Sequence, residues 1–534
     1  MVVVFLVRHN ACKRLKLATN AWKKPKSKVT FCSATTHILN VSKHTKMKIK
    51  LTIIILFTTL ISCAQTTFDE SSISKRTIKA VKNIEEVNQL MSSAVGAAGM
   101  RPEQWNNFEE LKKTATKEEL IELTNHPNGV VRSYSFWALS HIKDVDLFSI
   151  VKGHINDDEE ISTMFGCIIN NDKVGDFFID ILTPEYVDLN SEKMNSTELT
   201  ELDSLLIYQP NNLSSRYSAI NRAKPTENLY PKIRELVIEE KNQSALVTLA
   251  KYQKEQDIEI IKSNRSENEK IESGYYHTYV AISQFPRSEF IPLLETNLKK
   301  TLDNTHFSNE WRELYKAIAS YKNKKAVELL KVPFSKVEHQ NIKKYHIRFV
   351  YGAIQEFQDP IYNELYWRIW EEEGNISPEI YKYLFNENPS KTYELTKKEM
   401  IGNYQPQKSD FVPTSNGVEF TEGIYETMLN VLTVNDKDLA NKVIAEQILN
   451  SNVHNLSSYT SKVNKQNIFI EPLFERLEDA WNAHIYLDLV KTLIEYDNKE
   501  INQRILKTRK RNKNLNEDWG GKALDKLLAE NGIK

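Results

Sequence analysis

The amino-acid sequence predicts an all-α protein built as an α-α superhelix, in which antiparallel helix pairs stack along the chain. Gly (15 residues) and Pro (16 residues) are both scarce among 534 residues, which favours long helices joined by short turns. From about Ile78 onward, apolar residues recur three and four positions apart, and hardly any segment shows sustained alternation of apolar and polar residues. A third observation, a pattern that recurs at a fixed interval, indicates the type of helical fold.

Ala281, Ala317 and Ala353 each begin the same pattern, so the starts are 36 residues apart in both steps. Each Ala is followed by Ile, then by an aromatic residue, an apolar pair and a Leu. Looser copies begin at Thr248 and Thr492. A fixed period in the thirties is typical of a helical solenoid, in which each helix pair buries its apolar face against the next pair. The alternative is that independent amphipathic helices share a spacing.

Residues 117–142 indicate two short helices separated by a turn. The sequence Asn-His-Pro-Asn-Gly at 125–129 ends the first helix, whose apolar stripe holds Leu120, Ile121 and Leu123. Small residues in the second helix allow a close approach of the two. This segment resembles one HEAT repeat. The resemblance rests on Val131, Arg132, Ser135, Ala138 and Leu139, with Ile142 on the same face and with Phe136 and Trp137 where the family has smaller residues.

The resemblance implies a HEAT- or armadillo-like solenoid. It also implies that Ala138 is buried where two helices meet, and that Arg132 makes polar contacts along the array.

A signal sequence is predicted within the first part of the chain. Lys48 and Lys50 precede an apolar run from Leu51 to Ile61, which is too short to span a bilayer and fits the apolar region of a signal peptide. The end of this run, Leu-Ile-Ser-Cys, resembles the lipobox of bacterial lipoproteins, which implies that Cys63 is lipidated and becomes the first mature residue. Cleavage after Ala64 with simple secretion is the alternative, and a retained helix is the third.

The signal sequence changes the charge balance. Residues 1–62 hold 12 of the 71 Lys and Arg and none of the 71 Asp and Glu, so 59 basic residues remain against 71 acidic ones. A net charge near −12 argues against nucleic acid as a partner, because phosphate binding needs a basic surface. It also argues against electrostatic docking on an anionic membrane, so we expect membrane contact through the lipid alone.

The chain is expected to divide into eight segments. Residues 1–46 are a disordered leader or an N-terminus assigned too early, 47–62 the lipoprotein signal peptide, 63–76 a polar tether, 77–181 N-terminal HEAT-like repeats, 182–213 an irregular insertion, 214–401 central repeats, 402–420 a loop, and 421–534 C-terminal repeats. The two irregular segments are either functional loops or tolerated insertions.

No catalytic, cofactor or metal motif is found in the sequence. Cys167 lies in the apolar run TMFGCII and is expected to be a small buried core residue. The acidic run at 157–160 is expected at a helix start, where acids complement the helix dipole. His339 and His346 are expected on the surface. Trp519-Gly520-Gly521-Lys522 is expected to be a helix N-terminus, because Ala523 replaces the Ser or Thr of a phosphate loop.

These observations favour a non-catalytic lipoprotein of the bacterial cell envelope, anchored by lipid and facing the periplasm, or secreted if Cys63 carries no lipid. Its function would be to hold a protein or peptide on a concave helical face. One alternative is a lipoprotein that captures a sugar or peptide ligand, which an aromatic-lined pocket would favour. The other is a HEAT-like enzyme or maturation factor of lyase type, which rests on fold analogy alone.

Overall fold

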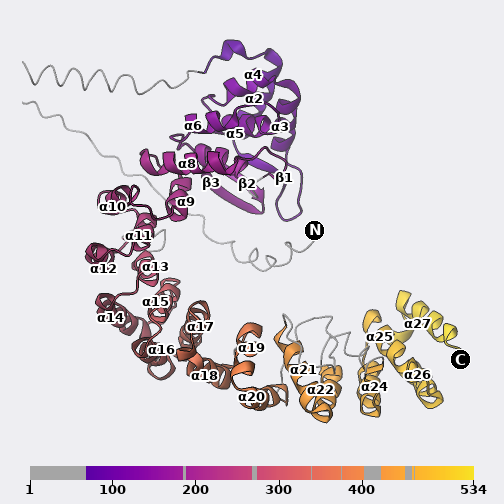
Figure 1. Ribbon diagram of the computed structural model, residues 1–534. Helices are drawn as coiled ribbons and strands as arrows, with labels where there is room; N and C mark the ends of the chain where they lie inside the picture. Colours follow the sequence, from indigo (N-terminus) through magenta and orange to yellow (C-terminus); the bar gives the residue numbers. More distant parts are fainter. Residues whose placement is uncertain are drawn as a thin grey trace, which may run out of the picture. The chain divides into compact units, whose positions relative to one another are not determined.

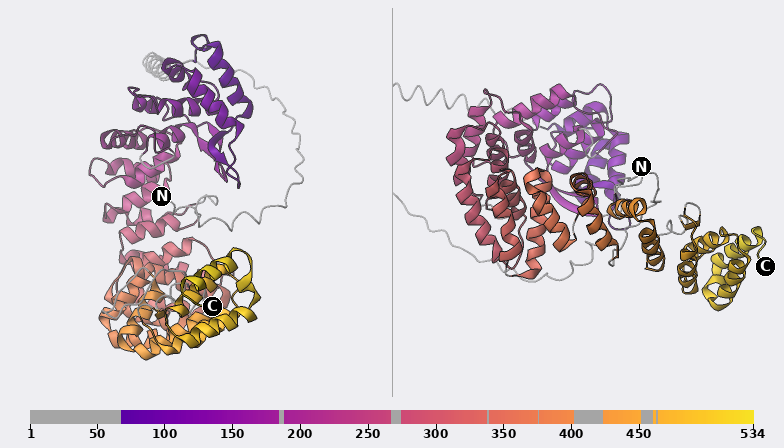
Figure 2. Two further views of the ribbon diagram at one scale, coloured as in Figure 1. Left: turned by 90° about the vertical axis from the view of Figure 1, so that its right-hand side faces the viewer. Right: turned by 60° about the horizontal axis from the view of Figure 1, so that its bottom comes forward.

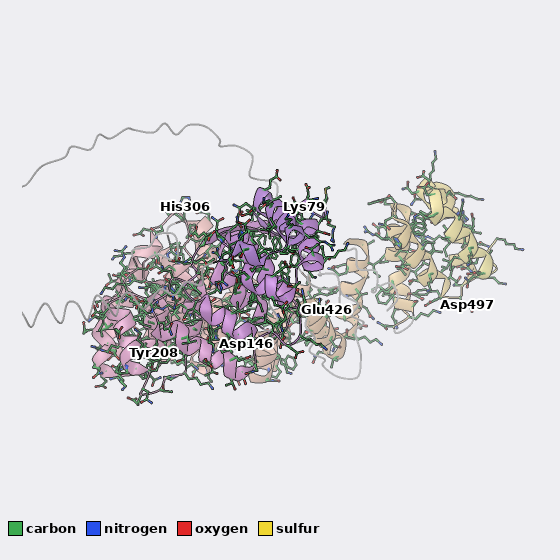
Figure 3. The ribbon with its side chains drawn as sticks, turned by 90° about the horizontal axis from the view of Figure 1, so that it is seen from above. Lys79, Asp146, Tyr208, His306, Glu426 and Asp497 are labelled. Carbon is green, nitrogen blue, oxygen red and sulfur yellow. The ribbon has the colours of Figure 1, made fainter. Side chains whose placement is uncertain are left out.

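The all-α class is confirmed, and side-chain caps show why the helices begin where they do. The helix α4 (Lys117–Leu123) begins after Thr116, whose hydroxyl accepts from the Glu119 N–H while the Glu119 carboxylate accepts from the Thr116 N–H. Asp146, labelled in Figure 3, caps α6 (Leu147–Gly153) by accepting from the Ser149 N–H at 3.0 Å. Such local contacts define helix starts independently of tertiary packing.

The computed structural model describes residues 68–183, 188–266, 274–337, 339–374, 376–401, 423–450, 460–461 and 464–534. Cys63, the leader, the signal peptide and the 402–420 loop lie outside these residues. Within them, no helix combines the length and the apolar character needed to cross a membrane. Residues 71–534 form one compact unit.

The first part of this unit contains helices and three strands (Figure 1). Its remaining elements are α2 (Lys75–Val87), β1 (Leu90–Val95), α3 (Glu103–Thr114), α5 (Gly129–Leu139), β2 (Glu160–Gly166), β3 (Ile168–Lys173), α7 (Val174–Leu182) and α8 (Ser196–Tyr208). Helix α8 lies within 182–213, so this segment is less irregular than the sequence predicted.

The rest of the described chain is helical. The middle part comprises α9 (Ser214–Arg222), α10 (Tyr230–Ile238), α11 (Gln243–Ala250), α12 (Ile258–Ser263), α13 (Tyr276–Gln284), α14 (Ile291–Leu302), α15 (Glu310–Ala319), α16 (Lys324–Lys336), α17 (Gln340–Glu356), α18 (Asn363–Glu373), α19 (Pro378–Glu387) and α20 (Pro389–Ile401). The last part comprises α21 (Ile424–Asn435), α22 (Lys437–Asn450), α24 (Ile470–Glu478), α25 (Ala483–Ile494), α26 (Lys499–Arg511) and α27 (Asp518–Glu530). Helix α27 confirms that residues 519–522 lie at a helix N-terminus.

The three strands form a sheet that the sequence did not predict. Strand β2 lies in the centre, parallel to β1 and antiparallel to β3. Ile161 and Thr163 of β2 are buried, whereas Glu160 is exposed and Ser162 half-buried. This alternation covers only a few residues, and the pairing of Leu90 with Thr163 joins positions far apart in the chain. An alternation this short and a pairing over this distance in the chain cannot be recognised from the local pattern of apolar residues.

Cys167 is exposed, which makes the prediction of a buried core cysteine wrong. The run TMFGCII is a strand, a turn and a second strand: Phe165 pairs with Ile168, and Gly166 and Cys167 form the two-residue turn between them. Gly166 has a φ of +57°, which suits glycine at the first position of a tight hairpin turn. The turn carries the thiol away from the core.

Residues 117–142 contain two helices, α4 and α5, joined by a turn, as predicted. Ala138 is buried, with 2% of its surface exposed, as predicted. Every residue of α5 is buried, because α2, α3, α4, α7, β1 and β2 all pack on it. The predicted stripe of α4 holds for Leu120 and Leu123, but Ile121 is 36% exposed.

Arg132 makes the polar contacts that the resemblance implied. Its guanidinium donates twice to the Asp157 carboxylate, at 2.8 and 2.9 Å, and once to Glu159 at 2.6 Å. It also donates to the carbonyl oxygens of His126, at 2.7 Å, and Pro127, at 3.0 Å. The acidic run at 157–160 lies before and at the start of β2, so the prediction of a helix start is wrong. Asp157 and Glu159 neutralise a buried cation instead of a helix dipole.

The 36-residue period corresponds to equivalent helices. Ala281, Ala317 and Ala353 lie near the C-terminal ends of α13, α15 and α17, all three are buried, and α13 packs on α15 as α15 packs on α17. A tyrosine hydroxyl joins neighbouring units: Tyr321 donates to the carbonyl of Arg287 at 2.5 Å. Figure 1 shows these helices following one another in chain order.

His346 is fully buried, which makes the prediction of a surface histidine wrong. Its ring stacks on Trp311 with centroids 4.4 Å apart, and its Nδ1 lies 2.7 Å from the Tyr315 hydroxyl. Burial lowers the pKa of His346 to about 4, so the imidazole is neutral at physiological pH. It acts as a packed aromatic residue between α15 and α17.

Candidate functional site

The most prominent cavity in the described part of the chain is an open groove of about 1330 Å³. It lies where α9, α11 and α13 begin and where α10 and α12 end (Figure 1). Helix α9 packs on α11, and α11 packs on α13, so three consecutive helix starts follow one another along it. We call it the amide groove, because its lining includes the carboxamides Asn211, Asn212, Asn242, Gln243 and Asn264.

Side chains cap the N-termini of α9 and α11 at the groove. The Asp176 carboxylate of α7 accepts from the backbone N–H groups of Ser214 and Ser215, both at 2.8 Å. Asn242 caps α11 by accepting from the Ala245 N–H at 2.9 Å. Helix N-termini carry unsatisfied N–H groups and partial positive charge, which carboxylate and carboxamide oxygens neutralise. Two of the three helix starts at the groove, those of α9 and α11, are therefore capped by side chains.

A buried ion pair lines the groove. The Arg216 guanidinium of α9 donates to both carboxylate oxygens of Glu240, at 2.7 and 3.0 Å, and only 9% of its side chain is exposed. Its arrangement repeats that of Arg132, since each Arg lies near a helix start and binds an acid 24 or 25 residues later. The charge of Arg216 is neutralised within the fold. Its side chain therefore fixes the position of the groove wall and does not offer a free cation to a ligand.

The carboxamides of the groove are partly engaged in hydrogen bonds within the fold. The side-chain N–H₂ of Asn212 donates to Asp158 at 2.7 Å, whereas the side-chain oxygen of Asn242 is occupied by the α11 cap. The Oδ1 atom of Asn264 is buried and has no hydrogen-bond partner in the described residues. A carboxamide offers a donor and an acceptor, as a peptide group does. The groove can therefore pair with peptide main chain.

The groove is lined by an exposed aromatic side chain and by charged side chains of both signs. Tyr217 is 51% exposed, and Lys241 and Arg265 are exposed as well. Asp158 and Glu160 lie on the same lining. Because both signs of charge are present, the groove does not select a ligand by charge alone.

A smaller pocket of about 240 Å³ adjoins the groove and shares Arg265 with it. Its lining includes the aromatic residues Tyr275, Tyr279 and Trp311 and the carboxylate of Glu310. Glu310 accepts from the Tyr275 N–H at 2.9 Å, and burial raises the pKa of its carboxyl above the ordinary value. Aromatic walls with one half-buried carboxylate suit a small polar or cationic group.

Neither cavity holds a cluster suited to metal chemistry. Across the described residues, no group of three or more His, Cys, Asp and Glu side chains is placed to hold a metal ion. His277 lines the groove, but burial lowers the pKa of its imidazole and keeps the ring neutral. The arrangement is suited to binding.

The sequence-predicted residues lie apart from this site. Cys63 falls outside the described residues, and Arg132 and Ala138 belong to the packing of α5. The 182–213 segment contributes Asn211 and Asn212 to the groove. The amide groove itself was missed, although Asn242 immediately before α11 is a readable signal of a capped helix start. What the sequence does not reveal is that the starts of α9, α11 and α13 line one groove.

Protein-family models, curated protein sequences and solved structures were each compared with the chain, and none of the three comparisons finds a match.

Proposed function

We propose that the protein is a non-catalytic, lipid-anchored scaffold of the bacterial envelope, which binds an extended peptide segment of a partner protein in the amide groove. The observation that carries the proposal is the set of five carboxamides that lines the groove beside the starts of α9, α11 and α13. An extended peptide exposes one N–H and one C=O per residue, and a line of carboxamides can pair with both.

The helix pairs of the scaffold are proposed to continue as a superhelical solenoid. Its support is the packing of α9, α11, α13, α15 and α17 in turn, together with the 36-residue period. Small-angle scattering should then show an elongated particle, and a spherical particle would contradict the proposal.

Attachment to the envelope is proposed to occur through a lipid on Cys63. Its support is the sequence around Cys63, which resembles a lipobox and follows a signal-like apolar run. The anchor would keep the groove near the membrane.

Peptide binding can be tested with one matched pair of variants. Peptides of about 12 residues are selected from a random displayed library on the immobilised protein, and their Kd is measured for each variant. Tyr217→Ala removes an exposed aromatic side chain from the groove, and truncation of such an aromatic contact weakens binding by roughly tenfold or more. Tyr208→Ala is the control, because Tyr208 is 46% exposed on α8 (labelled in Figure 3) and does not line the groove.

The proposal requires that Tyr217→Ala weakens the selected peptides and that Tyr208→Ala does not. Equal Kd values for both variants would show that the peptides bind elsewhere. A library that yields no binder at micromolar concentration would reject the peptide groove.

The smaller pocket supports a second candidate function, capture of a small ligand such as a sugar or a short peptide. The specific observation is its aromatic lining around Glu310. Calorimetric titration with sugars, amino acids and dipeptides tests it, with Asn304→Leu as a variant that fills the pocket from an exposed position. A ligand that binds the wild type and Asn304→Leu equally would not occupy this pocket.

A further inference from the structure

One end of the three-stranded sheet is formed by two loops without a charged side chain. The first loop is Val-Gly-Ala-Ala-Gly-Met at 95–100, and the second is Met-Phe-Gly-Cys-Ile-Ile at 164–169. They are neighbours, since Val95 pairs with Gly166 and the Gly96 N–H donates to the Gly166 carbonyl at 2.9 Å. We call these twelve residues the apolar tip.

The apolar tip is exposed. Met100 is 69% exposed, Ile169 is 65% exposed and Ile168 is 53% exposed. Figure 2 shows this end of the sheet extending beyond the neighbouring helices. Large apolar side chains that gather at an exposed end of a sheet mark a surface that another molecule or a membrane covers.

The backbone of the tip is largely satisfied by its own hydrogen bonds. Val95 and Met100 exchange two backbone hydrogen bonds, at 2.8 and 2.9 Å, and the Gly99 N–H donates to Gly96 at 3.0 Å. Gly96 and Gly99 have positive φ values of 72° and 61°, so this turn depends on glycine. A segment can enter an apolar medium only if its N–H and C=O groups are already paired. Val95, Gly96 and Met100 meet this requirement, since both the N–H and the C=O of each are paired.

We propose that the apolar tip inserts into the interface of a lipid bilayer whose headgroups are zwitterionic and carry no net charge. The tip contains no side chain that could form an ion pair, which excludes a charged partner surface as the favoured occupant. The inference rests on the proposed anchor: Cys63 is 12 residues before the start of α2 at Lys75, and an extended chain of this length spans roughly 40 Å at most. A lipid on Cys63 therefore keeps the sheet close to a bilayer.

The exposed thiol of Cys167 allows a direct test in the full chain. A probe whose emission shifts in an apolar environment is attached to Cys167 after Cys12, Cys32 and Cys63 are each replaced by Ser, and phosphatidylcholine vesicles are added. The expected result is a blue shift and quenching by lipids that carry a nitroxide in the acyl chain. Adding Ile169→Asp should lower the vesicle-bound fraction of the probe signal by about tenfold or more, because an acidic group is costly in the interface.

The matched control places the probe at Ile468→Cys in a chain whose Cys167 is also replaced by Ser. Ile468 is 43% exposed and lies far along the chain from the sheet, so its probe should stay in water. Unchanged emission of the Cys167 probe on vesicle addition would overturn the proposal, as would full insertion of the Ile169→Asp variant. A blue shift that instead rises with protein concentration without vesicles would identify a second copy of the chain as the occupant.

Failure of this test is distinguishable from failure of the anchor. The probe protein lacks Cys63, so tip insertion is measured without any attached lipid. The anchor is tested separately by labelling wild-type protein with palmitate. A labelled protein whose tip stays in water would retain the scaffold proposal and reject the tip.

Discussion

Replacement of Arg132 by Ala tests whether a buried ion pair holds the first helical units together. The five N–H groups of its guanidinium make five hydrogen bonds, three to the carboxylates of Asp157 and Glu159 and two to backbone carbonyls. Only 9% of the Arg132 side chain and 14% of the Asp157 side chain are exposed. The variant would therefore leave a buried carboxylate with the His154 ring, whose Nδ1 lies 3.1 Å away, as its remaining hydrogen-bond partner among the described side chains.

The expected loss in the free energy of unfolding is about 3 to 5 kcal/mol, the usual cost of removing one partner of a buried pair. Burial opposes ionisation of Asp157, yet hydrogen bonds from His154 and Arg132 hold the pKa of this carboxyl below its ordinary value. A depressed pKa contributes stability above the unfolded value, near 3.8, and this contribution is lost as the pH falls through the folded value. The difference between wild type and Arg132→Ala should therefore shrink below about pH 4.

Urea unfolding of the full chain, followed by circular dichroism and Trp fluorescence, measures the effect. Arg504→Ala is the control, because Arg504 and Glu471 form an ion pair with exposed side chains, 38% and 73%. Such a pair contributes roughly 0 to 1 kcal/mol. If Arg132→Ala and Arg504→Ala unfold at the same urea concentration at pH 7, the buried pair does not stabilise the fold and the reasoning is refuted.

Three further changes test the packing, the electrostatics and the anchor. Ala138→Leu should lower the free energy of unfolding by about 1 to 3 kcal/mol in the same assay, because it adds atoms where α5 is surrounded on all sides; a wild-type midpoint would place residue 138 on the surface. Burial and the charges of Asp176 and Asp172 raise the pKa of Asp180 to about 7, so its destabilising charge forms as the pH rises from about 4 through 7. Asp180→Asn should therefore be more stable than wild type by roughly 2 to 4 kcal/mol at pH 8 and show no gain at pH 4, and a gain that does not depend on pH would contradict this assignment. Cys63→Ser should lose palmitate labelling and leave the membrane fraction, and a wild type that never labels would reject the lipid anchor.

Much of the helical fold could be predicted from the sequence because its signals are local. Caps such as Thr116 with Glu119 lie within one turn of the helix they begin. The 36-residue recurrence of Ala281, Ala317 and Ala353 follows from equivalent helices with similar neighbours. The burial of Ala138 and the polar contacts of Arg132 were expected from the residue pattern at 131–139, although the acidic partners of Arg132 lie just before β2 and could not be named from that pattern.

Tertiary structure alone decided the features that depend on distant segments. Strand β2 pairs with the distant β1 through Leu90 and Thr163, and its hairpin with β3 places Cys167 in an exposed turn and not in the core. His346 is buried because α15 supplies Trp311 and Tyr315. The amide groove forms where three helix starts come together, and the apolar tip where two loops meet. A sequence pattern describes one segment and its period, whereas each of these features is a property of two or more segments brought together by packing.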